Sequence, residues 1–194
     1  MLGNVSHCED MDLIRLVSSG NEVAFNELYS RYRHRLYGYL NNLLPGQTTV
    51  VDDIFQQTWL RVLEQLPKYR DHGCFSAWLF RIGRNLLYDH LRKSRRTAAW
   101  LELDAGDTPE LDAPPEYAPW YELDEAEVGA AVADALASLL PEQKEVFLMR
   151  QENIPFREIA AIQQCSINTV LARMQYALKH LRAHLSKVDR GGLL

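Results

Sequence analysis

The stretch of sequence that decides the fold is PFREIAAIQQCSINTV, residues 155–170. Its apolar spacing predicts a short helix that ends near Gln163, a turn over 164–166, and a second helix from Ile167. A serine in the last position of such a turn accepts a hydrogen bond from the free N–H groups of the following helix, so Ser166 is the predicted N-cap. This spacing predicts a helix–turn–helix.

The second helix of the pair, which is expected to reach about residue 185, has one apolar side and one mixed side. The side chains expected to face outward are Asn168, Thr169, Leu171, Ala172, Arg173, Gln175, Tyr176 and Lys179. In DNA-binding helix–turn–helix domains the second helix sets its N-terminal residues against base edges. The exposed side of an ordinary helical hairpin is also polar, so this tract alone leaves both interpretations open.

Apolar residues recur at three- and four-residue steps in four further segments, 13–17, 25–43, 51–66 and 75–86. This is the period of an amphipathic helix, and no segment alternates as a strand does. Asp52 and Asp53 are expected in the first turn of their helix, where carboxylates interact favourably with the helix dipole. The sequence therefore predicts an all-α protein whose first 96 residues form a small bundle.

Charge is distributed unevenly along the chain. Residues 1–96 carry a net charge of +3, residues 97–140 carry −11 with no Lys or Arg, and residues 141–194 carry +3. Prolines and acids accumulate in the middle part, a composition that resists helix formation and does not bury enough apolar surface to fold. We therefore expect two small helical domains, 1–96 and 126–190, joined by a flexible acidic linker over 97–125.

The helix predicted around residues 78–96 is basic on its outer side. Residues 81–96 contain six Lys or Arg and one acid. The outward-facing side chains are expected to be Arg81, Arg84, Asn85, Tyr88, Arg92 and, further on, Arg95. Such a face suits a polyanion, because phosphate neutralisation releases counterions, and its Asn and Tyr side chains suit unpaired bases. A solvated, charged helix end is the alternative.

The segment VDDIFQQTWLRV, residues 51–62, combines a polar ridge with large aromatic residues. The ridge consists of Asp52, Asp53, Gln56 and Arg61, and it lies beside Phe55 and Trp59. This pattern fits either a protein-binding face or a half-buried helix.

Signatures of catalysis and of metal binding are missing from the sequence. It has no Gly-rich phosphate loop, no H-E-x-x-H, no G-x-S-x-G and no plausible cluster of carboxylates, so we predict no catalytic residue, metal ligand or cofactor. Cys8, Cys74 and Cys165 are far apart, which fits the reduced thiols of a cytoplasmic protein. No apolar stretch approaches membrane-spanning length and no signal peptide is recognisable, so we expect a cytoplasmic protein without membrane insertion.

Three segments have now been singled out: 51–62, the basic helix 78–96 and the helix–turn–helix that begins at 155. Taken together and in this order, they resemble the extracytoplasmic-function sigma factors, the smallest class of sigma-70-like bacterial initiation factors. The segment DDIFQQTW, 52–59, looks like the family's D-D-hydrophobic-x-Q-[DE]-x-[FW] segment, which docks on the clamp helices of the RNA polymerase β′ subunit. The pattern F-x-x-W-L-x-x-I-x-x-N-x-x-x-D-x-x-R, 75–92, looks like the helix that opens and reads the −10 promoter element. The tract from Leu140 to Arg173 resembles the helix–turn–helix that reads the −35 element.

The resemblance implies a fold and three sets of site residues. Residues 1–96 would be a sigma-2-like bundle and 126–190 a sigma-4-like helix–turn–helix domain. The polymerase-binding residues would be Asp52, Asp53, Phe55, Gln56, Gln57, Trp59 and Arg61. The −10 DNA-binding residues would be Arg70, His72, Trp78, Arg81, Arg84, Asn85, Tyr88, Asp89, Arg92 and Arg95. The −35 DNA-binding residues would be Arg157, Ser166, Asn168, Thr169, Leu171, Ala172, Arg173, Gln175, Tyr176 and Lys179.

The resemblance also implies a function and partners. Members of the family have no enzymatic activity and direct core RNA polymerase, through the β′ clamp helices and the β flap, to specific promoters. An anti-sigma factor, commonly anchored in the membrane, holds most members inactive and relays a stress, metal or envelope signal. The acidic linker would run through polymerase channels that are built for nucleic acid.

Five positions depart from the family pattern. Gln57 stands where an acid is usual, Asn168 where Gly is common, and Leu171-Ala172 where a basic residue and Ser are usual. The −35 sequence recognised is therefore expected to be unusual, with Arg173 outside and contacting phosphate. Gly83 replaces a common Ala, which predicts a modest loss of helix stability.

Two other function classes are compatible with parts of this sequence. A plain helix–turn–helix regulator with a helical sensor domain would bind duplex DNA alone, but it should lack the patterns at 52–59 and 75–92. A helical adaptor with an acidic partner would have no promoter-dependent activity. Transcription with core polymerase distinguishes the three classes.

Overall fold

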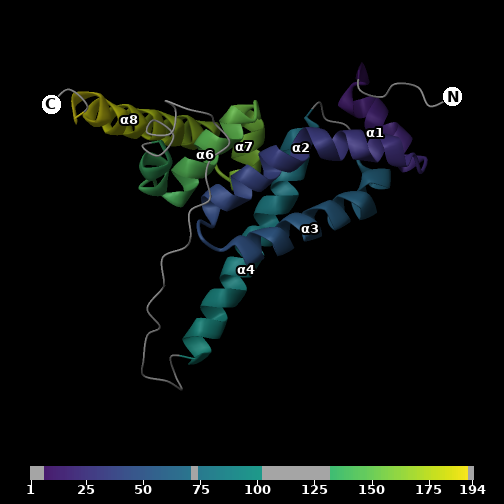
Figure 1. Cartoon of the computed structure of the whole chain (residues 1–194), viewed down its shortest axis with the longest axis horizontal. Coiled ribbons are helices and arrows are strands. Elements are labelled where there is room, and N and C mark those ends of the chain that lie inside the picture. The colour runs from purple at the N-terminus through teal and green to yellow at the C-terminus, as the bar shows by residue number, and fades with distance from the viewer. Residues whose placement is uncertain (1–6, 71–73, 102–131, 192–194) are drawn as a thin grey trace. The chain divides into compact units, whose positions relative to one another are not determined.

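The computed structural model describes residues 7–70, 74–101 and 132–191. Within these ranges the chain forms helices and turns and no strand, so the predicted all-α fold class is confirmed (Figure 1). The helices are α1 (Asp10–Ser18), α2 (Glu22–Leu43), α3 (Thr48–Gln65), the 3-10 helix η2 (Leu66–Lys68), α4 (Phe75–Leu101), α6 (Pro141–Gln151), α7 (Phe156–Gln163) and α8 (Ile167–Gly191), with a further helical stretch at 132–137. They belong to two compact units, unit 1 (Met1–Asp112) and unit 2 (Ala113–Leu194).

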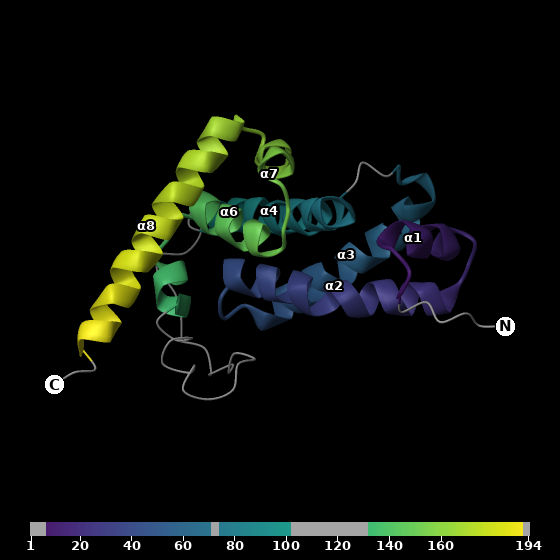
Figure 2. The same ribbon diagram turned by 90° about the horizontal axis from the view of Figure 1, so that it is seen from above.

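Unit 1 is a bundle in which α2, α3 and α4 share one core, with α1 packed against α2 (Figure 2). The apolar stripes that the spacing predicts are the sides on which these helices meet. The buried side chains include Leu28, Leu36, Leu40, Val51, Ile54, Val62, Leu79, Phe80 and Leu87. Burying each such side chain stabilises the fold by about 1.5–3 kcal/mol. Because these buried sides fix the rotation of each helix, they also determine which sides of α3 and α4 face outward.

Gly83 allows α4 to lie close to α2 and α3. A Cβ atom at this position would lie 3.2 Å from Leu36 Cδ1 and 3.5 Å from Thr58 Oγ1. The expectation of a modest loss of helix stability is therefore incomplete. The missing side chain also makes room for two neighbouring helices.

We expect Gly83→Val to lower the free energy of unfolding of unit 1 by about 1–3 kcal/mol, the usual effect of overpacking a core. Gly83→Ala should change it by less than about 1 kcal/mol, because its contact with the flexible end of Leu36 opposes a gain in helix propensity. Urea unfolding with peptide-resolved hydrogen exchange in α2 and α3 measures both. The control is Gly38→Val, since a Cβ at Gly38 meets nothing within 4 Å. Equal losses at the two glycines would contradict the packing argument.

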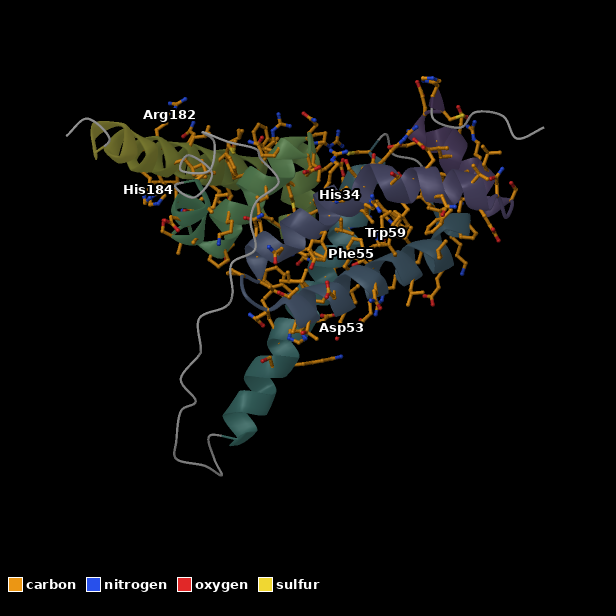
Figure 3. All side chains as sticks on the ribbon, in the orientation of Figure 1. His34, Asp53, Phe55, Trp59, Arg182 and His184 are labelled. Atoms are coloured by element: carbon orange, nitrogen blue, oxygen red, sulfur yellow. The ribbon has the colours of Figure 1, made fainter. Side chains whose placement is uncertain are left out.

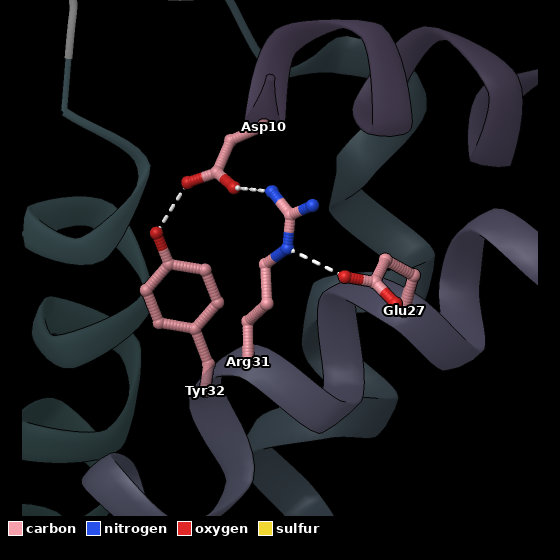
Figure 4. Close-up of polar contacts among 4 residues, drawn as sticks. All are labelled: Asp10, Glu27, Arg31 and Tyr32. Atoms are coloured by element: carbon pink, nitrogen blue, oxygen red, sulfur yellow. Dashed lines mark hydrogen bonds and ion pairs between the residues drawn. The ribbon is translucent and has the colours of Figure 1, made fainter. Parts of the chain in front are cut away.

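Hydrogen bonds to the Asp10 side chain link the N-terminal helix α1 to α2 (Figure 4). Its carboxylate accepts hydrogen bonds from Arg31 Nη1 at 3.0 Å and from the Tyr32 hydroxyl, and Arg31 Nε donates to Glu27 Oε1 at 2.9 Å. Burial and the bond to Asp10 raise the pKa of Tyr32. Burial acts to lower the pKa of Arg31, but the bonds to Glu27 and Asp10 outweigh it and raise that pKa. Tyr32 and Arg31 therefore keep their protons at neutral pH.

Two helix ends differ from the prediction. Because α3 begins at Thr48, Asp52 and Asp53 lie beyond its first turn, which contains no acid. The expected interaction of these carboxylates with the helix N-terminus is therefore wrong. Helix α4 continues to Leu101, past the predicted boundary at residue 96, and no Pro or Gly interrupts the sequence there. The remainder of the predicted linker, 102–125, lies outside the described residues.

Unit 2 is built around α8. Its buried side chains include Leu136, Leu139, Val146, Met149, Ile154, Ile159, Val170, Ala177 and Leu181. Helices α6 and α7 are followed by left-handed residues, Asn153 with φ 58° and Gln164 with φ 53°, which turn the chain between helices. The predicted cap of the last helix is present, because Ser166 Oγ accepts a hydrogen bond from the backbone N–H of Thr169 at 3.1 Å.

Candidate functional surfaces

The outward side of α3 carries acidic, amide and apolar side chains. The predicted residues that are exposed near the centre of this helix are Asp53, Gln56, Gln57 and Arg61. Leu60 is 60% exposed and Leu63 is 42% exposed. Both are missing from the predicted set, although Leu60 follows Gln56 by four residues and so shares its helix face. Exposed apolar side chains that gather on one face mark protein interfaces, so this surface fits a protein partner.

Trp59 is a core residue and not part of this surface. It is only 5% exposed, and its ring centre lies 5.9 Å from that of Phe25 and 4.9 Å from that of Tyr29. Figure 3 shows Trp59 and Phe55 between α2 and α3, whereas Asp53 lies on the other side of α3. The prediction that Trp59 contacts a partner directly is therefore corrected, because its side chain instead fixes α3 against α2.

Asp52 is exposed, but its position is set by α2. The hydroxyl of Tyr37 donates a hydrogen bond to Asp52 Oδ1 at 2.9 Å. Asp53, the next residue, is also exposed. The two adjacent carboxylates make the N-terminal half of the α3 surface negative, which suits a basic partner.

The outer side of α4 presents a stripe of polar side chains at steps of four, three and four residues. Its members are Arg81, Asn85, Tyr88 and Arg92, of which Tyr88 is half-buried and the others are exposed. The guanidinium carbon of Arg84 lies 4.4 Å from the centre of the Tyr88 ring. This cation–π contact keeps a positive charge beside an aromatic face. The stripe therefore combines cations with groups that hydrogen-bond to or stack on bases.

Asp89 and Arg92 form an ion pair on the same side of α4. Their side chains are 44% and 75% exposed. An exposed pair of this kind contributes little stability, so Arg92 can exchange Asp89 for a phosphate at small cost.

The N-terminal end of α4 continues the stripe with aromatic side chains. The ring centres of Trp78 and Tyr69 are 4.7 Å apart, and both residues are half-buried. Arg70 is exposed next to Tyr69. Of the other predicted residues, His72 and the side chain of Arg95 lie outside the part of the chain that the structure describes.

Helices α7 and α8 form the predicted helix–turn–helix of unit 2. The predicted residues that are exposed here are Arg157, Ser166, Asn168, Leu171, Ala172, Gln175, Tyr176 and Lys179. Thr169 is half-buried, and its hydroxyl oxygen lies 2.9 Å from Ser166 Oγ. Thr169 therefore helps to build the turn, and the other residues on α8 form its outer face.

A chain of hydrogen bonds joins α6, α7 and α8. Gln163 Nε2 donates to the Glu145 carboxylate at 2.9 Å and to the carbonyl oxygen of Glu142 at 3.0 Å, and Arg173 Nη1 donates to Gln163 Oε1 at 2.7 Å. Glu145 is fully buried, and Arg173 is half-buried. The prediction that Arg173 faces outward is therefore corrected, because its guanidinium is turned toward α7. Neither Glu145 nor Gln163 is in the predicted set, since their pairing spans 18 residues.

The described surfaces comprise an acidic and apolar face on α3, a basic face on α4, and a mixed face on α8. Over residues 7–70, 74–101 and 132–191, no three His, Cys, Asp or Glu side chains converge as metal ligands would. Within those ranges no helix combines the length and apolar character that a membrane crossing requires.

Comparison with protein families gives two matches in the same order as the two units. Residues 28–97 match the family model for sigma-70 region 2, and residues 129–181 match the model for sigma-70 region 4. The first range contains the α3 and α4 surfaces, and the second contains the helix–turn–helix.

Individual proteins agree with these matches. The ECF RNA polymerase sigma factor BldN of Streptomyces coelicolor is 34% identical over 142 residues, which cover 72% of this chain but only about half of BldN, 52%. The ECF RNA polymerase sigma-E factor of Haemophilus influenzae is 25% identical over 85% of this chain and 89% of its own length. Among solved structures, CnrH in complex with the cytosolic domain of CnrY is similar, with a TM-score of 0.62, 28% identity, and coverage of 92% of this chain and 97% of that chain.

Proposed function

Because the chain belongs to the extracytoplasmic-function sigma factors of the sigma-70 family, we propose that it directs core RNA polymerase to promoters through the three described surfaces. The observation that carries the proposal is the correspondence between the two family matches and the surfaces. Region 2 contains the faces of α3 and α4, and region 4 contains the helix–turn–helix. Domain roles follow the same division: unit 1 binds polymerase and the −10 element, and unit 2 binds the −35 element.

In this proposal the α4 stripe binds the opened −10 strand. Arg81, Arg84 and Arg92 supply positive charge for phosphates, and Asn85 supplies an exposed amide for a base edge. Tyr88 offers a ring for stacking, which suits single-stranded DNA because every base has a π-face. Unstacking a base costs a few kcal/mol, and contacts to the flipped base offset this cost.

The α3 face, with Asp53, Gln56 and Leu60, binds the clamp helices of the β′ subunit, and a second contact is made with the β flap. An acidic and apolar surface suits such a protein partner better than it suits DNA, since carboxylates repel phosphates. The protein acts as a DNA-binding regulator rather than as an enzyme, and its place of action is the cytoplasm, where polymerase and chromosome are found.

We also propose control by an anti-sigma factor. CnrH is similar over 92% of this chain, and its structure is a complex with the cytosolic domain of CnrY. An anti-sigma factor of this chain would cover the exposed faces of α3 or α8, which carry the apolar side chains Leu60, Leu63 and Leu171. Anchoring of that partner in a membrane is part of the proposal.

Transcription with purified core polymerase on a library of promoters tests the proposed function. Asn85→Ala is expected to reduce open-complex formation by about 1–3 kcal/mol, roughly 5- to 150-fold, because one base contact is lost. The loss should be confined to promoters with one particular base in the −10 element, and it should persist on templates that are already melted there, because the lost contact is to the opened strand.

Asn26→Ala is the matched control, because Asn26 is likewise an exposed helical asparagine of unit 1, on α2. It should leave transcription unchanged. If Asn85→Ala changes only the −35 preference, the assignment of α4 to the −10 element is wrong. If the unaltered protein supports transcription from no promoter, the proposed function itself is wrong.

A further inference from the structure

The first turns of α8 expose apolar side chains on the face that the proposed function sets against DNA. Ile167 is 46% exposed and Leu171 is 38% exposed, and they lie four residues apart on one side of the helix. Ala172 is exposed beside Leu171. These residues belong to the first turns of α8, the part of a recognition helix that reaches base edges.

The same turns expose no cation. Of the described side chains between residues 166 and 176, Arg173 is the only cationic one, and it is half-buried. Its Nη1 is held 2.7 Å from Gln163 Oε1 and 3.5 Å from Cys165 Sγ, which directs the head group toward α7. Gln163 is in turn bonded to the fully buried Glu145, so this orientation of Arg173 is anchored in the core of unit 2.

The remaining exposed polar groups in these turns are the amides of Asn168 and Gln175 and the hydroxyls of Ser166 and Tyr176. Major-groove chemistry gives each type of side chain a preferred base. Arg and Lys read guanine O6 and N7, Asn and Gln read adenine N6 and N7, and apolar side chains contact the C5-methyl group of thymine. Hydroxyl groups bond to more than one base and select none. A face with amides, hydroxyls and apolar groups but without a cation therefore matches A·T pairs and offers nothing specific to guanine.

We propose that α8 reads A·T pairs in the −35 element, with Leu171 packed on a thymine methyl group and Asn168 or Gln175 bonded to adenine. This inference rests on the proposed function, and it adds the base class that α8 selects. During transcription the occupant is duplex DNA rather than a protein, because the matched region 4 contains this face and exposed cations are present on both helices of the pair. Arg157 on α7 and Lys179 further along α8 are exposed and placed for phosphates.

Substitution of deoxyuridine for thymine tests the methyl contact directly, because uracil lacks only the C5-methyl group. The assay is transcription by the full chain with core polymerase on synthetic promoters that carry one such substitution at a time in the −35 element. One thymine position should lose about fourfold in promoter binding, the equivalent of about 0.8 kcal/mol for one buried methyl group.

Leu171→Ala should remove this sensitivity to deoxyuridine. Once the leucine side chain is gone, the thymine methyl group has lost its contact, so removing the methyl group as well has no further effect. Leu140→Ala is the matched control, since Leu140 is 61% exposed in the same unit but precedes α6. It should keep the full deoxyuridine effect. Leu171→Arg should shift the preferred base at one −35 position toward guanine and leave the −10 preference unchanged.

The outcomes separate this inference from the proposed function. If transcription occurs but every deoxyuridine substitution is neutral, or if selection from a −35 library gives G·C pairs at the positions that respond to Leu171, the inference is overturned and the apolar group is left to a protein partner. If no promoter supports transcription, the proposed function fails first.

Discussion

Replacing Gln163 with alanine is expected to destabilise unit 2 by about 2–4 kcal/mol. The side chain of Gln163 makes three hydrogen bonds, to Glu145, to the carbonyl of Glu142 and to Arg173. Hydrogen bonds to charged groups contribute about 1.5–3 kcal/mol, and the cost rises when a buried acceptor loses its donor. Glu145 is fully buried, so its carboxylate loses a donor in a place that water does not reach.

Peptide-resolved hydrogen exchange of the full chain in urea measures this effect, because it reports α7 and α8 separately from unit 1. Gln151→Ala is the matched control, since Gln151 is exposed at the end of α6. It should change the stability of unit 2 by less than about 0.5 kcal/mol. Equal protection of α7 and α8 in both variants would show that the bonds of Gln163 contribute nothing to the unit.

The same substitution has a second consequence for DNA recognition. With Gln163 removed, Arg173 loses the acceptor that holds it against α7. The released guanidinium then adds a cation to the outer face of α8, so −35 binding should become more dependent on salt by about one phosphate contact. The stability of unit 2 therefore reports mainly the bond from Gln163 to Glu145, and the salt dependence of −35 binding reports the bond from Arg173 to Gln163.

Helix positions could be predicted because they depend on local spacing. The apolar steps in 25–43, 51–66 and 75–86 give the sides on which α2, α3 and α4 meet, and the turn ending at Ser166 has its cap. Each of these features depends on residues within a few positions of one another. The outer side of α4 follows from the same argument, because the exposed side of a helix is opposite its apolar stripe.

What could not be predicted depends on partners far apart in the chain. Trp59 shares a segment with Asp53, but its burial depends on Phe25 and Tyr29 of another helix. Arg173 lies at the border between the inner and outer sides of α8, and only its contact with Gln163 decides which way it turns. The effect of Gly83 likewise depends on how closely α2 approaches α4.

Asp53→Arg is expected to weaken binding to core polymerase by about 2–4 kcal/mol, roughly 30- to 900-fold in Kd. Asp53 is exposed on α3 next to Asp52 and on the same helix face as the apolar Leu60. In the variant, a basic partner that docks on this face would meet the positive charge of the new arginine in place of a carboxylate. Asp53 is preferred to Asp52 for this test because Asp52 accepts a hydrogen bond from Tyr37, and its loss would also disturb the bundle. Competition between labelled and unlabelled full chain for core polymerase measures the affinity.

Glu22→Arg makes the same change in net charge in the same unit, at an exposed position on a different helix, α2. It separates a specific contact at Asp53 from a general effect of charge on association, since a general effect moves both variants alike. Circular dichroism should give the same helix content for both variants, because neither residue is in the core. Affinity that is unchanged by Asp53→Arg, or reduced equally by Glu22→Arg, would remove the polymerase assignment from the N-terminal half of the α3 face and leave Leu60 and Leu63 as its remaining support.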